Sequence, residues 1–399
     1  MENSSRKVYD FDRVIERKGT MSVKYDYVPE EGMPEDVLPL WVADMDFRVP
    51  DEVVEVLKDT AEHGIFGYSV SDERYSAAVT GWYERHFGWK ADPDWMVTTP
   101  GVVFAVSCAV RAFTQPGDGI LIQQPVYYPF RRMIESNGRR VVNNPLLFSG
   151  KRYTIDFSDF EAKIVSEQVK MFILCSPHNP VGRVWSEEEL RRLAKICKRH
   201  GVIIFSDEIH SDFVWEGNTH HVLAGLDEEI AQFTVTATAP SKTFNLAGLQ
   251  NSNILIANPQ LREQFIQARD QTGYSECNIM GMRACMSVYE NGDAWLSQLK
   301  AYLAENIRFM EQFLREQIPC LNMIRPEGTY LVWVDCRSLG LGSSERKEFM
   351  RSKAKLWLDE GEMFGKEGEG FERFNIACPR NILEKALRQL KDAVDTHIL

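Results

Sequence analysis

Polar residues follow three short apolar runs in the middle of the chain. The residues are Asn179, Asp207 and Lys242, and the runs that precede them span 171–174, 202–205 and 233–238. Runs of this length that alternate with helical patterns predict buried strands of a mostly parallel sheet. Because ligands bind beyond the carboxyl ends of strands in open α/β sheets, we expect the three side chains to meet at one edge.

An amine, a carboxylate and an amide at one edge suit pyridoxal phosphate. The Lys242 amine can form a Schiff base with its aldehyde. Asp207 can keep its ring nitrogen protonated, so that the ring accepts electrons, and Asn179 can bond to its hydroxyl. Taken singly, these residues are typical of a surface lysine, a helix cap and a turn. Their combination favours the cofactor site.

Further candidates lie outside these three turns. Gly101, Val102 and Val103 stand where a loop enters an apolar helix, whose first amides could bind a phosphate. Tyr127 could stack on a flat ring, although a Tyr-Tyr pair is more often part of a core. Arg373, on a short alternating run, would normally be a surface charge, but it could grip a substrate carboxylate with two hydrogen bonds.

The elements that must position these residues can be outlined. Ser186 and Glu189 form a capping box that opens a helix, which we expect to end near Gly201. Further strands are predicted over 120–122, 253–256 and 329–335, a long amphipathic helix over 293–318, and a flexible glycine-rich loop over 361–370. We divide the chain into an N-terminal segment (1–47) packing across two domains, a large domain (48–290) and a small α+β domain (291–399).

Composition excludes several classes of protein. The 399 residues carry a net charge of -12, which argues against nucleic-acid and anionic membrane surfaces. No apolar run is long enough to span a membrane, and the first residues do not resemble a secretory signal. The eight cysteines are scattered without a CxxC pair, so we expect free thiols in a reducing cytoplasm and no metal site.

Several motifs together resemble a known family. They are Ser176-Pro177-His178-Asn179-Pro180-Val181-Gly182-Arg183, Ser206-Asp207-Glu208-Ile209-His210, Ser241-Lys242-Thr243-Phe244-Asn245 and Arg373-Phe374-Asn375. This set resembles fold-type I pyridoxal phosphate enzymes of the class I/II aminotransferase superfamily over nearly the whole chain. Trp41–Phe47, Gly328–Leu331 and His210 resemble the MalY/PatB branch of cystathionine β-lyase-like C–S lyases.

The resemblance implies a fold and an assembly. The fold is α/β, with a mostly parallel seven-stranded sheet, helices on both faces and a smaller α+β C-terminal domain. Members are usually homodimers with active sites at the interface, and Tyr68 resembles a tyrosine that reaches the cofactor phosphate of the neighbouring subunit.

The resemblance also implies residue roles. Lys242 would carry the cofactor and shuttle protons, with Asp207 at the ring nitrogen. Asn179 and His210 would lie near the ring hydroxyl, Tyr127 on the ring, and Arg373 on the substrate carboxylate. The phosphate would be held by the Gly101, Val102 and Val103 stretch together with Ser241.

Three positions depart from the common family pattern. His210 stands where many aminotransferases have a tyrosine, and it matches the C–S lyase-like branch. Ala239 and Gln250 stand where many members have a serine and an arginine that bind the phosphate. Asn251 or Asn253 could compensate.

The leading hypothesis is α,β-elimination of cystathionine or another cysteine-type amino acid to pyruvate, ammonia and a thiol. A class I/II aminotransferase shares the early steps, and a regulatory protein on the same fold is a further alternative. A nicotinamide dehydrogenase is set aside, because Gly117-Asp118-Gly119 lacks the third glycine of the dinucleotide motif.

Overall fold

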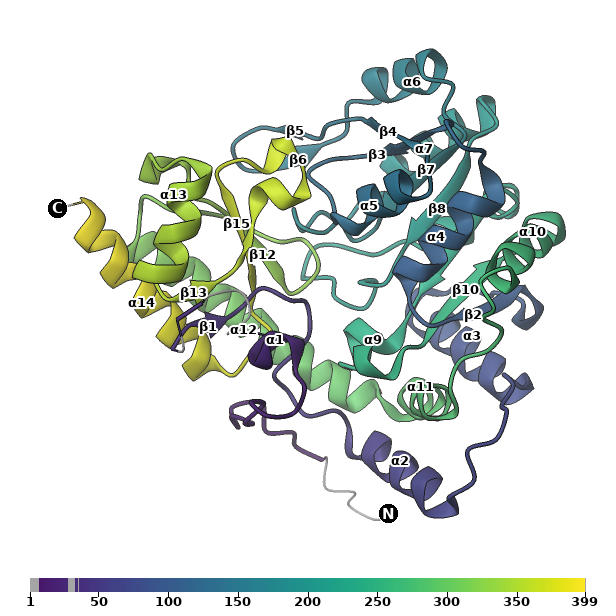
Figure 1. Cartoon of the computed structure of the whole chain (residues 1–399), viewed down its shortest axis with the longest axis horizontal. Coiled ribbons are helices and arrows are strands. Elements are labelled where there is room, and N and C mark those ends of the chain that lie inside the picture. The colour runs from purple at the N-terminus through teal and green to yellow at the C-terminus, as the bar shows by residue number, and fades with distance from the viewer. Residues whose placement is uncertain (1–6, 28–32, 35, 399) are drawn as a thin grey trace.

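The computed structural model describes residues 7–27, 33–34 and 36–398. Figure 1 shows two sheets side by side, each with its own helices, and the N-terminal segment beside the smaller one. No helix among the described residues combines the length and the apolar character needed to cross a membrane.

The larger sheet has seven strands and confirms the predicted α/β fold. The pairings from β9 through β8, β7 and β3 to β4 are parallel, whereas β10 is antiparallel to both of its neighbours. In spatial order the strands are β2 (Met96–Thr99), β10 (Ser252–Ile256), β9 (Thr234–Thr238), β8 (Ile203–Asp207), β7 (Met171–Cys175), β3 (Gly119–Ile122) and β4 (Arg140–Asn143).

Helices cover both faces of this sheet, and its central strands β7, β8, β9 and β10 are almost entirely buried. Ile173 packs toward one face, and its neighbours Phe172 and Leu174 pack toward the other. The first face is covered by α4 (Val102–Phe113), α5 (Pro129–Ser136) and α10 (Pro259–Asp270), and the second by α6 (Phe157–Ser166) and α7 (Glu187–Arg199). The Ser186–Glu189 capping box that was predicted for α7 is confirmed.

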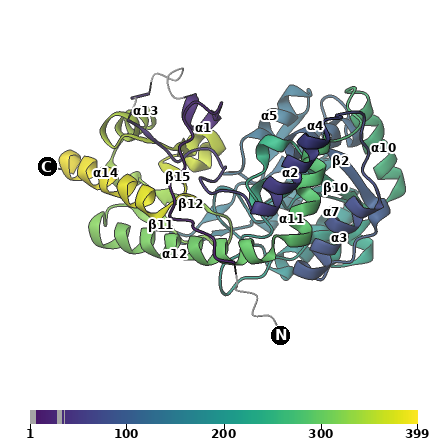
Figure 2. The ribbon, with the colours of Figure 1, turned by 90° about the horizontal axis from the view of Figure 1, so that it is seen from below.

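Four further helices lie beside this core or lead away from it. Figure 2 shows the group of α2, α3 and α11, and α12 running from it to the smaller sheet. Their bounds are α2 (Asp51–His63), α3 (Glu73–Phe87), α11 (Ile279–Asn291) and α12 (Asp293–Gln317). The predicted helix over 293–318 is therefore confirmed.

The smaller sheet is antiparallel, with four strands in the order β11-β12-β15-β14. Its strands are β11 (Asn322–Ile324), β12 (Leu331–Asp335), β14 (Asp359–Glu360) and β15 (Phe371–Asn375), and its helices are α13 (Ser343–Glu348) and α14 (Arg380–Ile398). The shorter elements are a hairpin and three one-turn helices. The hairpin consists of β5 (Leu147–Phe148) and β6 (Tyr153–Thr154), and the helices are α1 (Val23–Asp26), α8 (Glu228–Ala231) and α9 (Pro240–Thr243).

The N-terminal segment contacts both parts of the molecule. Strand β1 (Leu38–Pro39) pairs with β13 (Leu356–Trp357) near the small sheet. Farther along, the Met45 amide donates to Asn245, which follows α9. The boundaries 47/48 and 290/291 themselves stay a prediction.

The prediction of a flexible loop over 361–370 is wrong. The segment forms two 3₁₀ helices, Gly361–Phe364 and Lys366–Gly368, and Phe364 is fully buried. A Cβ on Gly361 or Gly368 would collide with the carbonyl of the other. These glycines permit close backbone packing rather than motion.

Candidate active site

A cavity of about 230 Å³ lies at the carboxyl edge of β7, β8 and β9. Its wall contains most of the residues selected from the sequence, namely Gly101, Val102, Val103, Tyr127, Asn179, Asp207, His210, Ser241 and Lys242. Arg373 lies just behind this wall, and Tyr68 lies elsewhere on the surface.

Strand register brings the central residues together. Cys175, the last residue of β7, is opposite Asp207, the last residue of β8, and Asp207 is opposite Ala237 of β9. The chain then turns directly into α9, which carries Lys242. The parallel strands therefore deliver their polar residues to one edge, as predicted.

Asp207 is a buried carboxyl at this edge. Its Oδ1 accepts a hydrogen bond from the Ile209 amide at 3.1 Å. Burial raises its pKa to about 7, although this amide and the Lys242 charge act in the opposite direction. No ion pair of Asp207 occurs within the described ranges. A cationic ligand nitrogen would stabilise its charged form.

Lys242 is half-buried, with its side chain on the cavity wall. Its Nζ donates to the Ala43 carbonyl oxygen at 2.7 Å. Burial lowers its pKa to about 8, and Arg373 adds to this effect, while Asp44 and Asp207 oppose it. A substantial fraction of the amine is therefore neutral near physiological pH, as a nucleophile or base requires.

His210 is neutral and incompletely bonded. Burial lowers its pKa to about 3, with smaller contributions from Lys242 and Arg373. Its Nδ1 is buried and has no hydrogen-bond partner among the residues that the structure describes. A buried polar atom of this kind at a cavity wall is suited to a ligand contact.

Arg373 is buried on β15 and fixed by several groups. Its Nη1 donates to Asn179 Oδ1 at 3.0 Å, its Nη2 donates to the Trp41 carbonyl at 2.8 Å, and it pairs with Asp359. Burial raises the pKa of Asp359 to about 6, although Arg373 opposes that rise. The guanidinium is thus held rigidly next to a cavity residue.

The start of α4 forms another part of the wall. The first amides of a helix have no intrahelical acceptor, so those of Val102 and Val103 can donate to an anion. Of the two candidates for a compensating residue, Asn251 lines the cavity, whereas Asn253 is buried outside it and accepts from Tyr75. Gln250 does not line the cavity, and Ala239 is the N-cap of α9.

Tyr68 lies in the extended stretch between α2 and α3 and is fully exposed. Ile65, Phe66 and Val70 of this stretch are exposed as well. Its expected contact with a neighbouring subunit stays a prediction.

Sequence reasoning missed three contributors and left a fourth open. Ala43 supplies a carbonyl from a motif used only as a family marker, and Cys175 ends a strand that was predicted one residue too short. Asn251 was only one of two options, and Asp359, the partner of Arg373, carried no signal in the sequence.

The donor set fits pyridoxal phosphate. It combines a partly neutral amine, a buried carboxyl, an amide, an unsatisfied imidazole nitrogen and the first turn of a helix around one cavity. Each group matches a different part of the cofactor: aldehyde, ring nitrogen, hydroxyl and phosphate.

The chain belongs to the aminotransferase class I and II family, whose model matches residues 35–390. It is 44% identical to cystathionine beta-lyase PatB of Bacillus subtilis over 96% of this chain and 100% of that protein. This confirms the resemblance to the MalY/PatB branch.

Two solved structures share the fold along almost the whole chain. Cystalysin from Treponema denticola, which contains a pyridoxal 5'-phosphate cofactor, matches with a TM-score of 0.95 and 39% identity over 98% of this chain and 100% of its own. A pyridoxal phosphate-bound putative aminotransferase from Clostridium difficile matches with a TM-score of 0.95 and 38% identity over 97% and 100%. The predicted fold type is therefore confirmed.

Proposed function

We propose that this chain is a pyridoxal phosphate-dependent carbon–sulfur β-lyase. It would convert cystathionine or a related cysteine-type amino acid, with water, to pyruvate, ammonia and a thiol. The observation that carries the proposal is a half-buried amine and a buried carboxyl, Lys242 and Asp207, on the wall of one cavity beside a fixed arginine. Similarity to a protein named cystathionine beta-lyase supports this choice of substrate class.

Named residues would hold the cofactor. Asp207 would bond to the ring nitrogen, Asn179 and His210 to the hydroxyl side, and Tyr127 would cover the ring. The amides of Val102 and Val103, with Gly101 as N-cap, would hold the phosphate, together with Ser241. When bound, the cofactor joins the amine of the substrate and withdraws electron density from its Cα.

Proton transfer would fall to Lys242. Its pKa of about 8 leaves enough neutral amine to remove the Cα proton of the substrate near neutral pH. Asp207 would keep a proton on the ring nitrogen, because a carboxyl buried without a cation gains most from such a partner.

Substrate orientation would fall to Arg373. Its guanidinium, fixed by Asp359 and the Trp41 carbonyl, would bind the α-carboxylate and so direct the Cα proton toward Lys242. A thiolate would then leave from Cβ, which is favoured because thiols are much more acidic than alcohols.

Incubation of the purified protein with L-cystathionine tests the proposal. Pyruvate and thiol should form without any keto-acid acceptor, and Lys242→Ala should lower the rate at least about 100-fold. A strict need for an acceptor would instead identify an aminotransferase. The solved structure described as a putative aminotransferase favours that second candidate.

We also propose a homodimer in the cytoplasm. The exposed apolar stretch around Tyr68 would pack on a second copy, bringing its hydroxyl to the partner's phosphate site. All eight cysteines are free thiols, which agrees with a reducing compartment.

A further inference from the structure

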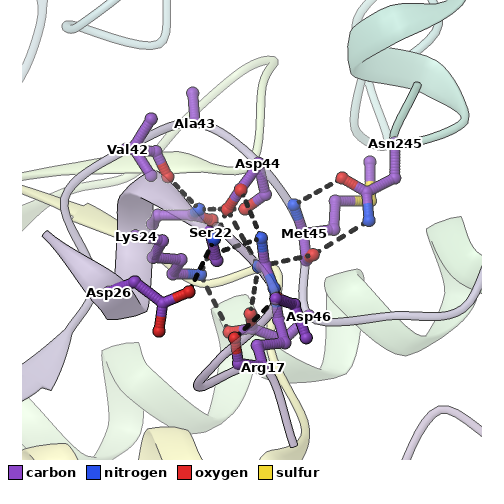
Figure 3. Close-up of polar contacts among 12 residues, drawn as sticks. Arg17, Ser22, Lys24, Asp26, Val42, Ala43, Asp44, Met45, Asp46 and Asn245 are labelled. Atoms are coloured by element: carbon purple, nitrogen blue, oxygen red, sulfur yellow. Dashed lines mark hydrogen bonds and ion pairs between the residues drawn. The ribbon is translucent and has the colours of Figure 1, made fainter. Parts of the chain in front are cut away.

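A cluster of charged residues ties the N-terminal segment to the loop that faces Lys242 (Figure 3). Arg17 donates to both oxygens of Asp44, at 3.2 and 2.7 Å, and to Asp46 at 2.7 Å. Lys24, which is fully buried, donates to Asp46 at 2.8 Å. The cluster is charge-balanced, with two cations and two carboxylates, so it can persist in a buried place.

The same loop, Val42–Phe47, is held from the opposite side by Asn245. The Asn245 side chain accepts from the Met45 amide at 2.9 Å and donates to the carbonyls of Met45 and Phe47 at 2.9 and 3.1 Å. Figure 3 shows Arg17 and Asn245 on different sides of the backbone between Asp44 and Asp46. Asn245 has a φ of 59°, a left-handed conformation that asparagine tolerates better than most residues.

The held loop presents its Ala43 carbonyl to Lys242. That oxygen lies 2.7 Å from Lys242 Nζ and also accepts from the Tyr330 hydroxyl at 3.2 Å. A carbonyl at this distance stabilises the protonated amine more than the neutral one. Its position therefore affects when the lysine can act as a base.

We infer that Arg17 and Asn245 are positioning residues for Lys242, the proposed base. They hold the loop Val42–Phe47 from two sides and so fix the Ala43 carbonyl next to the Lys242 amine. Neither residue would touch the substrate. The inference rests on the proposed role of Lys242 and adds a function for the N-terminal segment, which would tune the site as well as complete the fold.

The test uses the full-length protein from which any cofactor has been removed. The rate at which added pyridoxal phosphate reacts with Lys242 depends on the fraction of the amine that is neutral. The rate is followed by visible absorbance across a pH series, with Lys242→Ala as the blank. In Arg17→Lys the charge is kept but the forked contacts are lost. The Ala43 carbonyl is then held less firmly beside the ammonium, although Asn375 still bonds to the carbonyls of Val42 and Asp44. The midpoint should therefore fall by about 0.5 pH unit from the wild-type value near 8.

Asn245→Gly provides an independent arm. Glycine accepts the left-handed backbone, so only the side-chain contacts are lost, and the same downward shift is expected. If Arg17→Lys does not fold, the Asn245→Gly variant alone tests the positioning role. Lys18→Ala is the matched control, since it removes a charge from the exposed neighbour of Arg17 and should leave the midpoint unchanged.

The outcomes separate the two claims. If wild type and Lys242→Ala give the same absorbance, the proposed function fails. If wild type reacts but the midpoints of folded Arg17→Lys and Asn245→Gly equal that of Lys18→Ala, the positioning role is overturned.

Discussion

At the scale of single residues, burial shifts the pKa values of Asp207 and Lys242 in opposite directions. Burial disfavours charge, so it raises the pKa of Asp207 to about 7 and lowers that of Lys242 to about 8. Perturbed groups of this kind cluster at functional sites. In the free protein they cost stability that a bound cofactor would restore.

Asp207→Asn should stabilise the cofactor-free protein in a pH-dependent manner. The folded-state pKa of Asp207 lies above the ordinary value of 3.8, so the wild type loses stability as pH rises from there through about 7. Asparagine keeps the oxygen that accepts from Ile209 and lacks the charge. Urea unfolding should show a gain of a few kcal/mol at pH 8 and a smaller gain at pH 5. A gain that did not grow with pH would contradict the assignment.

Arg373→Lys should weaken substrate binding while the charge is kept. A lysine cannot reproduce the forked contacts to Asn179, Trp41 and Asp359 and still bind a carboxylate at two points. We expect KM to rise about 10- to 100-fold, in line with the loss of about 1.5–3 kcal/mol from a charged hydrogen bond. Arg388→Lys, on the exposed face of α14, should leave KM unchanged.

At the scale of elements, the sequence was most informative where local signals agree. The cap of α7 and the apolar runs of β7, β8 and β9 depend on neighbouring residues, so they could be predicted together with the side chains at their ends. The antiparallel direction of β10 and the pairing of β1 with β13 depend on partners far along the chain, and no local pattern encodes them.

The residues of the candidate site likewise divide into those that local patterns could predict and those that only the tertiary fold brings to the site. Asp207 ends β8, and Asn179 and Lys242 follow closely after β7 and β9, so local patterns could predict all three. Ala43, 199 residues before Lys242, and Asp359 reach the site through the tertiary fold alone.

Ser186→Ala should destabilise the fold without altering the chemistry. The Ser186 hydroxyl accepts from the Glu189 amide at 3.2 Å, and the Ser186 amide donates to the Glu189 carboxylate at 2.9 Å. Loss of the cap should cost about 1 kcal/mol in urea unfolding, with kcat unchanged. Ser344→Ala, an exposed serine of α13, is the control and should change neither quantity.

At the scale of the whole molecule, two sheets are joined by α12 and by the N-terminal segment (Figure 2). We propose the division 1–47, 48–290 and 291–399, which the start of α12 at Asp293 supports. The N-terminal segment would then be shared, since it bonds to Asn245 on one side and pairs with β13 on the other.

Tyr68→Phe should weaken cofactor binding in the proposed dimer. The substitution removes one hydroxyl from the exposed stretch and leaves its apolar surface intact, so sedimentation should still give about twice the chain mass of 45.9 kDa. Equilibrium titration should show cofactor affinity reduced by about threefold to tenfold. Tyr27→Phe, another exposed tyrosine, serves as the control. An unchanged affinity would place the phosphate contact elsewhere.

The bonds between the two ends of the chain have a consequence for biosynthesis. Asn375 donates to the carbonyls of Val42 and Asp44, and Arg373 to that of Trp41, at sequence separations of 331 to 333. A nascent polypeptide leaving the ribosome therefore makes the loop early but receives its anchoring side chains only near the end of translation. A product that terminates before Arg373 would therefore lack the side chains that anchor the carbonyls of Trp41, Val42 and Asp44, and the loop beside Lys242 would be held less firmly.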